Sequence, residues 1–318
     1  MDTDKKDAIF LIIQKMLEKP PVIIWGSGAT IPFGLPSMQD LNKMLSEKVK
    51  DFDGSNNNLE EELGKEKYLK ILPKIRQIIW DRINGADKII LSELISNKDK
   101  YSGVLALIKK FLEPHPQNIN IITTNYDRLL EYVMTYYNIN FTDGCSGRVL
   151  SAFNEDIFKD KNIVNLIKVH GSLNWGKIDN EIRYTDIFNK NIEPVIIPPG
   201  KNKYQETYHS PYRELIQYSD KVIKKADSFF AIGFGFNDEH ITPRIINKIN
   251  SGTPNVLITR TITQTADKEL KNAKNYVLLE KSDTDNTKVR IRQNGENTTS
   301  SFLDKDYWTL TKFMEDIL

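Results

Sequence analysis

The sequence has a single cysteine, Cys145, and this scarcity limits the chemistry available to the chain. One cysteine excludes an intramolecular disulfide and any zinc site built on two CxxC pairs. It fits a reducing cytosol, so we expect a cytoplasmic location. An excess of charge is also missing, because 44 basic residues face 43 acidic ones. This balance gives no electrostatic argument for direct binding of nucleic acid or of an anionic membrane.

Long hydrophobic runs are absent too, and none of the apolar segments could cross a bilayer. The apolar residues near the N-terminus recur with helical spacing, at Ile9, Ile12, Ile13, Met16 and Leu17. Gln14 and Lys15 interrupt the run. The pattern predicts an amphipathic helix rather than a signal peptide.

The domain organisation follows from length and from helical periodicity. A chain of 318 residues can bury a substantial core, and we expect a single domain over residues 1–318. Residues 41–112 carry mostly helical patterns without chemically distinctive groups, with an interruption expected at Pro73, and predict a helical insertion. Residues 304–318 predict a C-terminal helix that docks back onto the domain.

The most informative stretch, VIIWGSGATIPFGLPSMQDL, begins at Val22. Val22–Ile24 predicts a buried strand, Gly26 and Gly28 a turn, and Ser37 the cap of a helix. A strand, a glycine turn and a helix can present backbone N–H groups to an anion, and glycines let a pyrophosphate approach closely. Ile31 stands where the simple dinucleotide fingerprint needs its third glycine. A tight core turn therefore stays open as an alternative.

Two further predicted strands end in polar groups. Ile119–Thr123 runs into Asn125 and Asp127, each of which could instead cap the following helix. Ile163–Val169 ends at His170, which can exchange a proton near neutral pH. The other histidines are weaker candidates: His115 lies between prolines, His209 lies in a polar loop and His240 starts a helix.

A second glycine turn follows a later predicted strand. Ser228–Ile232 is apolar, GFGFND follows from Gly233 to Asp238, and a helix is expected over 239–249. Repeated strand–loop–helix units predict an α/β fold with a Rossmann-like, doubly wound, mostly parallel sheet. In such sheets ligands bind beyond the carboxyl ends of the strands, so we expect the four loops to meet at one edge.

In this order, the motifs resemble those of the SIR2 (sirtuin-like) family. GSGAT with FGLP is similar to its first NAD loop, TTNYD to its polar active-site motif, HG to its catalytic histidine and GFGFND to its second nucleotide loop. The resemblance implies catalytic roles for Asn125 and His170. It implies NAD contacts for Gly26, Ser27, Gly28, Ala29, Thr30, Gly34, Pro36, Asp127, Gly233, Gly235, Asn237 and Asp238.

The sequence differs from the protein deacylases of this family in two features, and both differences argue against deacylase activity. A single cysteine cannot build their zinc module, so we expect the helical insertion in its place and no metal. Ser37, Met38 and Gln39 stand where deacylases carry Asp-Phe-Arg. The chain is more similar to SIR2-like effectors of bacterial antiphage defence, which hydrolyse NAD.

This closer resemblance implies an NAD+ glycohydrolase that depletes NAD in abortive infection. It also implies control by homo-oligomerisation or by a partner such as an ATPase or an Argonaute-type protein. A non-catalytic module that senses NAD or ADP-ribose is the main alternative, and a protein deacylase is the weaker one.

Overall fold

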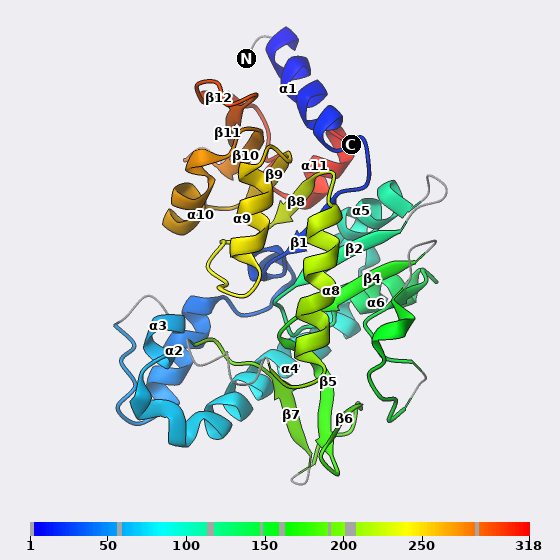
Figure 1. The fold of residues 1–318 in the computed structure, drawn as a ribbon, viewed down its shortest axis with the longest axis vertical. Helices are drawn as coiled ribbons and strands as arrows, with labels where there is room; N and C mark the ends of the chain where they lie inside the picture. Colours follow the sequence, from blue (N-terminus) through cyan, green and yellow to red (C-terminus); the bar gives the residue numbers. More distant parts are fainter. Residues whose placement is uncertain are drawn as a thin grey trace.

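The computed structural model describes residues 3–55, 59–112, 118–146, 149–158, 163–189, 192–200, 208–283 and 286–318. Within these ranges a nine-stranded sheet crosses the molecule (Figure 1). Its strands are β1 (Val22–Trp25), β2 (Ile119–Thr123), β3 (Phe141–Thr142), β4 (Val164–Lys168), β8 (Phe229–Ile232), β9 (Asn255–Thr259), β10 (Tyr276–Lys281), β11 (Thr287–Arg292) and β12 (Thr299–Leu303).

The strand order is β12-β11-β10-β9-β8-β1-β2-β4-β3, and all neighbours from β10 to β3 are parallel. Only β11 and β12 at one end pair in the antiparallel direction. From β1 the chain proceeds outward through β2 and β4, and later returns to the other side of β1 through β8, β9 and β10. This reversal is the doubly wound topology, so the predicted fold class is confirmed.

Helices cover both faces of this sheet. The α-helices of the described residues are α1 (Thr3–Met16), α2 (Met38–Lys48), α3 (Leu59–Leu63), α4 (Leu72–Ser96), α5 (Ser102–Leu112), α6 (Leu129–Tyr136), α8 (Tyr212–Lys225), α9 (Thr242–Asn250), α10 (Gln264–Glu269) and α11 (Leu310–Asp316). Because side chains alternate along a strand, Ile23 and Trp25 of β1 join the core beneath α1 to α6 and α11. Val22 and Ile24 join the core beneath α8, α9 and α10.

The segment between β1 and β2 is helical, as its periodicity predicts. Its longest helix, α4, buries Ile75, Ile79 and Ile83 along one face. Pro73, expected to interrupt a helix, instead stands in the first turn of α4, where a missing N–H breaks no intrahelical hydrogen bond. The C-terminal helix α11 packs on α5, with Thr311 in the space that a side chain at position 103 would need.

A small antiparallel sheet of β6 (Glu181–Tyr184), β5 (Gly171–Ile178) and β7 (Glu193–Ile196) follows β4, and its strands β5 and β6 were not predicted. In β5 the residues from Gly171 to Gly176 are all buried, including Ser172 and Asn174. Polar and apolar residues alternate from Ser172 to Trp175, but burial does not, because both faces of this strand are covered. No helix in the described ranges is long and apolar enough to span a membrane.

Candidate active site

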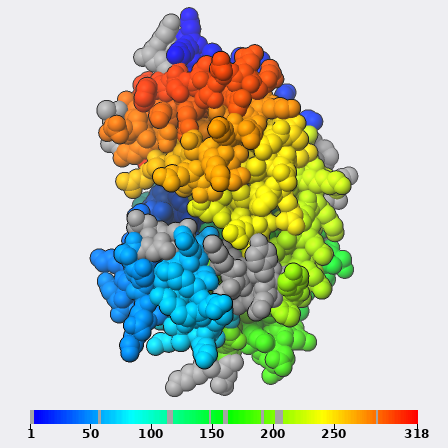
Figure 2. Space-filling view, turned by 60° about the vertical axis from the view of Figure 1, so that its left-hand side comes forward, coloured from blue at the N-terminus to red at the C-terminus, as the bar shows by residue number. Residues whose placement is uncertain are grey.

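Four neighbouring strands, β8, β1, β2 and β4, end at the same edge of the sheet and lead into the four predicted loops. Direct contacts join the loops. The N–H of Gly28 donates to the carbonyl of Gly233 at 3.0 Å, and Nδ2 of Asn125 donates to the carbonyl of Gly26 at 3.1 Å. In Figure 2 a recessed blue patch of the N-terminal part lies between the orange and yellow C-terminal part and the light-blue helical segment. The expectation that the loops meet is confirmed.

The glycines at this edge allow the two glycine loops to touch. A Cβ on Gly26 would lie 2.3 Å from the carbonyl oxygen of Gly233. Gly233 has φ +57°, and a Cβ there would lie 2.1 Å from the backbone nitrogen of Ala29. These distances are far below van der Waals contact, so both positions require glycine for loop packing, whatever ligand binds nearby.

The backbone N–H groups of the first glycine loop are used within the protein. Those of Gly26 and Gly28 donate to the carbonyls of Ile232 and Gly233, and those of Ala29 and Thr30 donate back into the loop itself. At these four positions the hydrogen bonds favour the tight core turn that the sequence left open as an alternative to anion binding. These hydrogen bonds hold the backbone of the loop in one conformation.

The helix after this loop is capped as predicted, but its N-terminus is already occupied. Ser37 accepts a hydrogen bond from the N–H of Asp40, and the Asp40 carboxylate accepts from the N–H of Ser37, which forms a capping box. These bonds hold the pKa of Asp40 below its usual range. A carboxylate at the start of α2 offsets the dipole that was expected to attract an anion.

The remaining predicted nucleotide-binding residues vary in exposure. Ser27 and Ala29 lie in a 3-10 turn directly after β1. Gly34, with φ +99°, and Asn237 are exposed, and Pro36 is half-buried. Gly235 lies in the second loop, where its carbonyl accepts a hydrogen bond from Thr263 beyond β9 at 2.7 Å.

Asn125 and Asp127 divide the two roles that the sequence left open. Asp127 closes a side-chain turn just before α6, since its Oδ1 accepts from the N–H of Leu129, the first residue of that helix, at 3.3 Å. Asn125 instead turns toward the first glycine loop. Thr123 Oγ1 accepts from the N–H of Asn125 at 3.0 Å and donates to the carbonyl of Trp25 at 2.7 Å, which ties this turn to β1.

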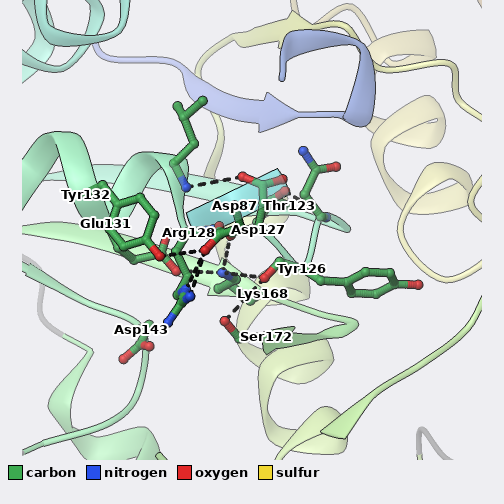
Figure 3. A network of polar contacts seen from close by, with 12 residues as sticks. Asp87, Thr123, Tyr126, Asp127, Arg128, Glu131, Tyr132, Asp143, Lys168 and Ser172 are labelled. Atoms are coloured by element: carbon green, nitrogen blue, oxygen red, sulfur yellow. Dashed lines mark hydrogen bonds and ion pairs between the residues drawn. The ribbon is translucent and has the colours of Figure 1, made fainter. Parts of the chain in front are cut away.

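Residues 124–128 connect β2 to α6 (the Asn125 turn), and a buried charged cluster packs against this turn at Tyr126 and Asp127 (Figure 3). Lys168 of β4 is fully buried, and its Nζ donates to the carbonyls of Tyr126 and Asp127 at 3.3 and 2.6 Å. It also pairs with Oε1 of Glu131 at 2.5 Å. Burial raises the pKa of Asp127 to about 7 and also raises the pKa of Glu131, in both cases against the opposing field of Lys168.

Arg128 extends this cluster toward the helical segment. Its backbone N–H and its Nε donate to the two carboxylate oxygens of Asp87 on α4, at 2.7 and 2.9 Å. Tyr132 donates to the same carboxylate at 2.5 Å. The Asn125 turn is thus fixed on one side by Lys168 and on the other by the helical insertion.

His170 lies at the end of β4, and only 3% of it is exposed. Its Nε2 is 3.1 Å from Oδ2 of Asp238, but the N–H direction does not point at that oxygen, so Nε2 has no hydrogen-bond partner among the described residues. The ring of His240 packs edge-on against it, with centroids 5.7 Å apart. The sequence makes His240 only a weak candidate, because nothing local indicates that it approaches His170. His209 is exposed, and His115 lies outside the described residues.

A large cavity of about 1270 Å³ lies beside this edge, between α4 and α6. Arg128, Glu131, Tyr132 and Asp143 contribute to its lining. None of the predicted NAD-binding or catalytic residues lines it. Among the described residues, no group of three or more histidine, cysteine, aspartate or glutamate side chains is placed to hold a metal ion.

One family model and several solved structures are similar to this chain. The family model described as SIR2-like domain matches residues 119–295. No curated protein matches the chain. The fold is similar to that of a Sir2 homologue in complex with NAD, at 16% identity over 86% of this chain and 87% of that chain, with a TM-score of 0.48. It is also similar to a mutant Sir2 homologue in complex with 2′-O-acetyl ADP ribose, at 16% identity over 84% and 88%, with a TM-score of 0.45.

Proposed function

This chain belongs to the SIR2-like domain family, and from that premise we propose that it is an NAD+ glycohydrolase that cleaves the nicotinamide–ribose bond. One observation carries the proposal: a buried imidazole, that of His170, stands at the sheet edge where the loops of Asn125 and of both glycine turns meet. The edge lies at the carboxyl ends of parallel strands, where doubly wound folds bind dinucleotides.

The reaction requires positioning, stabilisation of positive charge and a base. When the bond between C1′ and nicotinamide breaks, its electron pair leaves with nicotinamide, which becomes neutral, and the ribose becomes cationic. Water then adds to C1′, and its proton passes to His170. General-base assistance of this kind contributes about 100- to 10,000-fold in rate.

Asn125 would orient the nicotinamide ribose and the attacking water through its amide. The hydrogen bond from its Nδ2 to Gly26 at 3.1 Å fixes that amide in one direction, which supports such a role. For Asp127, the hydrogen bond that its carboxylate accepts from the N–H of Leu129 favours orientation of the Asn125 turn over direct contact with the carboxamide. The touching glycine loops would provide a rigid wall against the adenosine half of NAD+.

We also propose a biological role from the resemblance described above. Hydrolysis would deplete NAD+ in antiphage defence, and activity would depend on homo-oligomerisation or on a partner such as an ATPase or an Argonaute-type protein. Expression of the chain with its neighbouring genes, with NAD+ measured in infected and uninfected cells, tests this role. An NAD+ level that stays constant during infection would contradict it.

The catalytic proposal is tested by nicotinamide release from NAD+, followed by chromatography with no acylated peptide present. We expect His170→Ala and Asn125→Ala each to reduce release by at least about 100-fold, with little change in melting temperature. The matched controls are His209→Ala and Asn272→Ala, since both of these side chains are exposed.

Three outcomes would contradict the proposal. Saturable NAD+ binding without release, with the neighbouring gene products present, would indicate a sensing module. Release that requires an acylated peptide would indicate a deacylase. Variants that unfold would show that His170 and Asn125 are structural.

A further inference from the structure

The buried, titratable side chains of His170, Asp238 and His240 lie next to one another at the candidate active site. Asp238 Oδ2 lies 3.1 Å from Nε2 of His170, and the ring of His240 stands at 88° to that of His170. His170, Asp238 and His240 are 3%, 6% and 6% exposed, so water contributes little to holding the imidazole. Asp238 and His240 both come from the connection between β8 and α9.

The Asp238 carboxylate is itself fixed by backbone. Its Oδ1 accepts from the N–H groups of His240 and Ile241 at 3.0 and 3.1 Å, and its carbonyl accepts from the N–H of Thr242 at 3.1 Å. Capping of this turn accounts for Oδ1. It does not require Oδ2 to face His170, so the second oxygen points to a further role.

We infer that Asp238 is a positioning residue that holds the imidazole of His170 in one tautomer and one orientation, with the His240 ring as its lateral support. This inference rests on the proposed function and deepens it. A carboxylate beside Nε2 favours the tautomer with the proton on Nε2, which leaves the lone pair of Nδ1 as the base. The proton of the attacking water then moves to Nδ1, and Asp238 stabilises the imidazolium that forms.

The contact between Asp238 and His170 is poorly aligned in the structure. Catalytic hydrogen bonds commonly tighten only when substrate is bound, so this geometry is compatible with the role. The same geometry argues against the NAD contact that the sequence resemblance implies for Asp238. Its oxygens face a backbone turn and an imidazole, and a buried carboxylate next to a pyrophosphate would repel it.

Asp238→Asn separates these roles, because asparagine forms the same side-chain-to-backbone turn as aspartate and has nearly the same shape. We expect the melting temperature to stay unchanged, kcat to fall about 100-fold or more, and KM for NAD+ to change less than about threefold. Asp238→Ala should also lower the melting temperature because the cap is lost. Raised KM with unchanged kcat would show a nucleotide contact, and unchanged kcat and KM would show a purely structural cap; either result overturns the inference.

His240 is tested by a pair of substitutions. His240→Ala should lower kcat about tenfold, because the His170 ring loses its support, and His240→Phe should restore part of that loss by replacing the ring. Equal kcat for wild type and His240→Ala would remove His240 from the assignment.

A readout independent of catalysis keeps the inference separate from the proposed function. The chain has four histidines, so long-range nitrogen–proton NMR of labelled histidine can assign each ring by single substitutions to glutamine. We expect His170 to carry its proton on Nε2 in wild type and to become a tautomer mixture in Asp238→Asn. An unchanged tautomer would overturn the inference even if nicotinamide is released. A changed tautomer in a protein that releases none would reject the proposed function alone.

Discussion

Two parts of the same sheet edge are built in opposite ways. Where β1 and β8 end, the loops meet through bare backbone, and the Cβ of an alanine at position 26 would lie 2.3 Å from the carbonyl oxygen of Gly233. Where β2 and β4 end, long charged side chains make the contacts, with Lys168 against Glu131 and Arg128 against Asp87. One part depends on the absence of side chains, and the other on their presence.

The two parts should therefore be destabilised by different kinds of substitution. The backbone part cannot accept even a methyl group, because a backbone contact has no rotamers with which to adjust. The charged part can accept side chains of similar shape, but it cannot lose one member of a pair, because the remaining charge stays buried. Three stability measurements test this contrast.

The largest effect is expected at Lys168. Lys168→Met leaves Glu131 buried without its cation, so we expect the free energy of unfolding to fall by about 4 kcal/mol, measured by urea denaturation. Lys100→Met is the matched control, because Lys100 pairs with Glu93 at 2.8 Å with both side chains about one-third exposed. It should cost less than about 1 kcal/mol. Equal costs for the two variants would show that burial does not set the strength of these pairs.

A smaller loss is expected from the glycine contact. Gly26→Ala places a methyl group against the backbone of Gly233, and we expect a loss of about 3 kcal/mol in the free energy of unfolding. Gly85→Ala is the control, because Gly85 lies in α4 and a Cβ there meets no atom within 4 Å. It should stabilise the protein by up to about 1 kcal/mol. A Gly26→Ala protein with wild-type stability would mean that the two loops can separate freely.

The smallest effect depends on pH. Burial raises the pKa of Asp127 to about 7, whereas an aspartate in an unfolded chain titrates near 3.9 (about the model-peptide value). Between these values the unfolded chain binds fewer protons than the folded one, so Asp127 makes stability fall as pH rises from about 4 to about 7. Asp127→Asn has no carboxyl group to titrate at this position, so it does not lose stability in this way. The free energy of unfolding of the variant, minus that of wild type, should therefore increase by on the order of 2 kcal/mol as the pH is raised from about 5 to about 8.

Asp40→Asn is the contrasting control for this measurement, because hydrogen bonds from Ser37 lower the pKa of Asp40. Its titration lies below that window, so its difference from wild type should stay constant there. A constant difference for Asp127→Asn as well would contradict the raised pKa of Asp127. Thermal unfolding of the three proteins across the pH range provides the comparison.

Much of the fold was predictable because the relevant signals are local. The strand prediction of Ile119–Thr123 agrees with β2, and those of Val22–Ile24 and Ser228–Ile232 agree with β1 and β8 to within one residue at either end. Apolar β-branched runs followed by polar turns mark buried parallel strands. The site was predictable as far as the strand ends that bring Asn125 and His170 to one edge.

Three features of the site were not predictable from the sequence. The reason for glycine at position 26 is the loop of Gly233, which is distant along the chain. The role of His240 depends on the approach of His170 from another strand. The division between Asn125 and Asp127 depends on the positions of Gly26 and α6.

The sequence by itself determined which residues form strands and which polar groups follow them, because periodicity and turn chemistry act between near neighbours in the chain. Only the tertiary structure decided which groups touch: His170 with Asp238, Lys168 with Glu131, and one glycine loop with the other. The physical reason is that burial, desolvation and close backbone approach depend on distances between segments that strand order alone brings together.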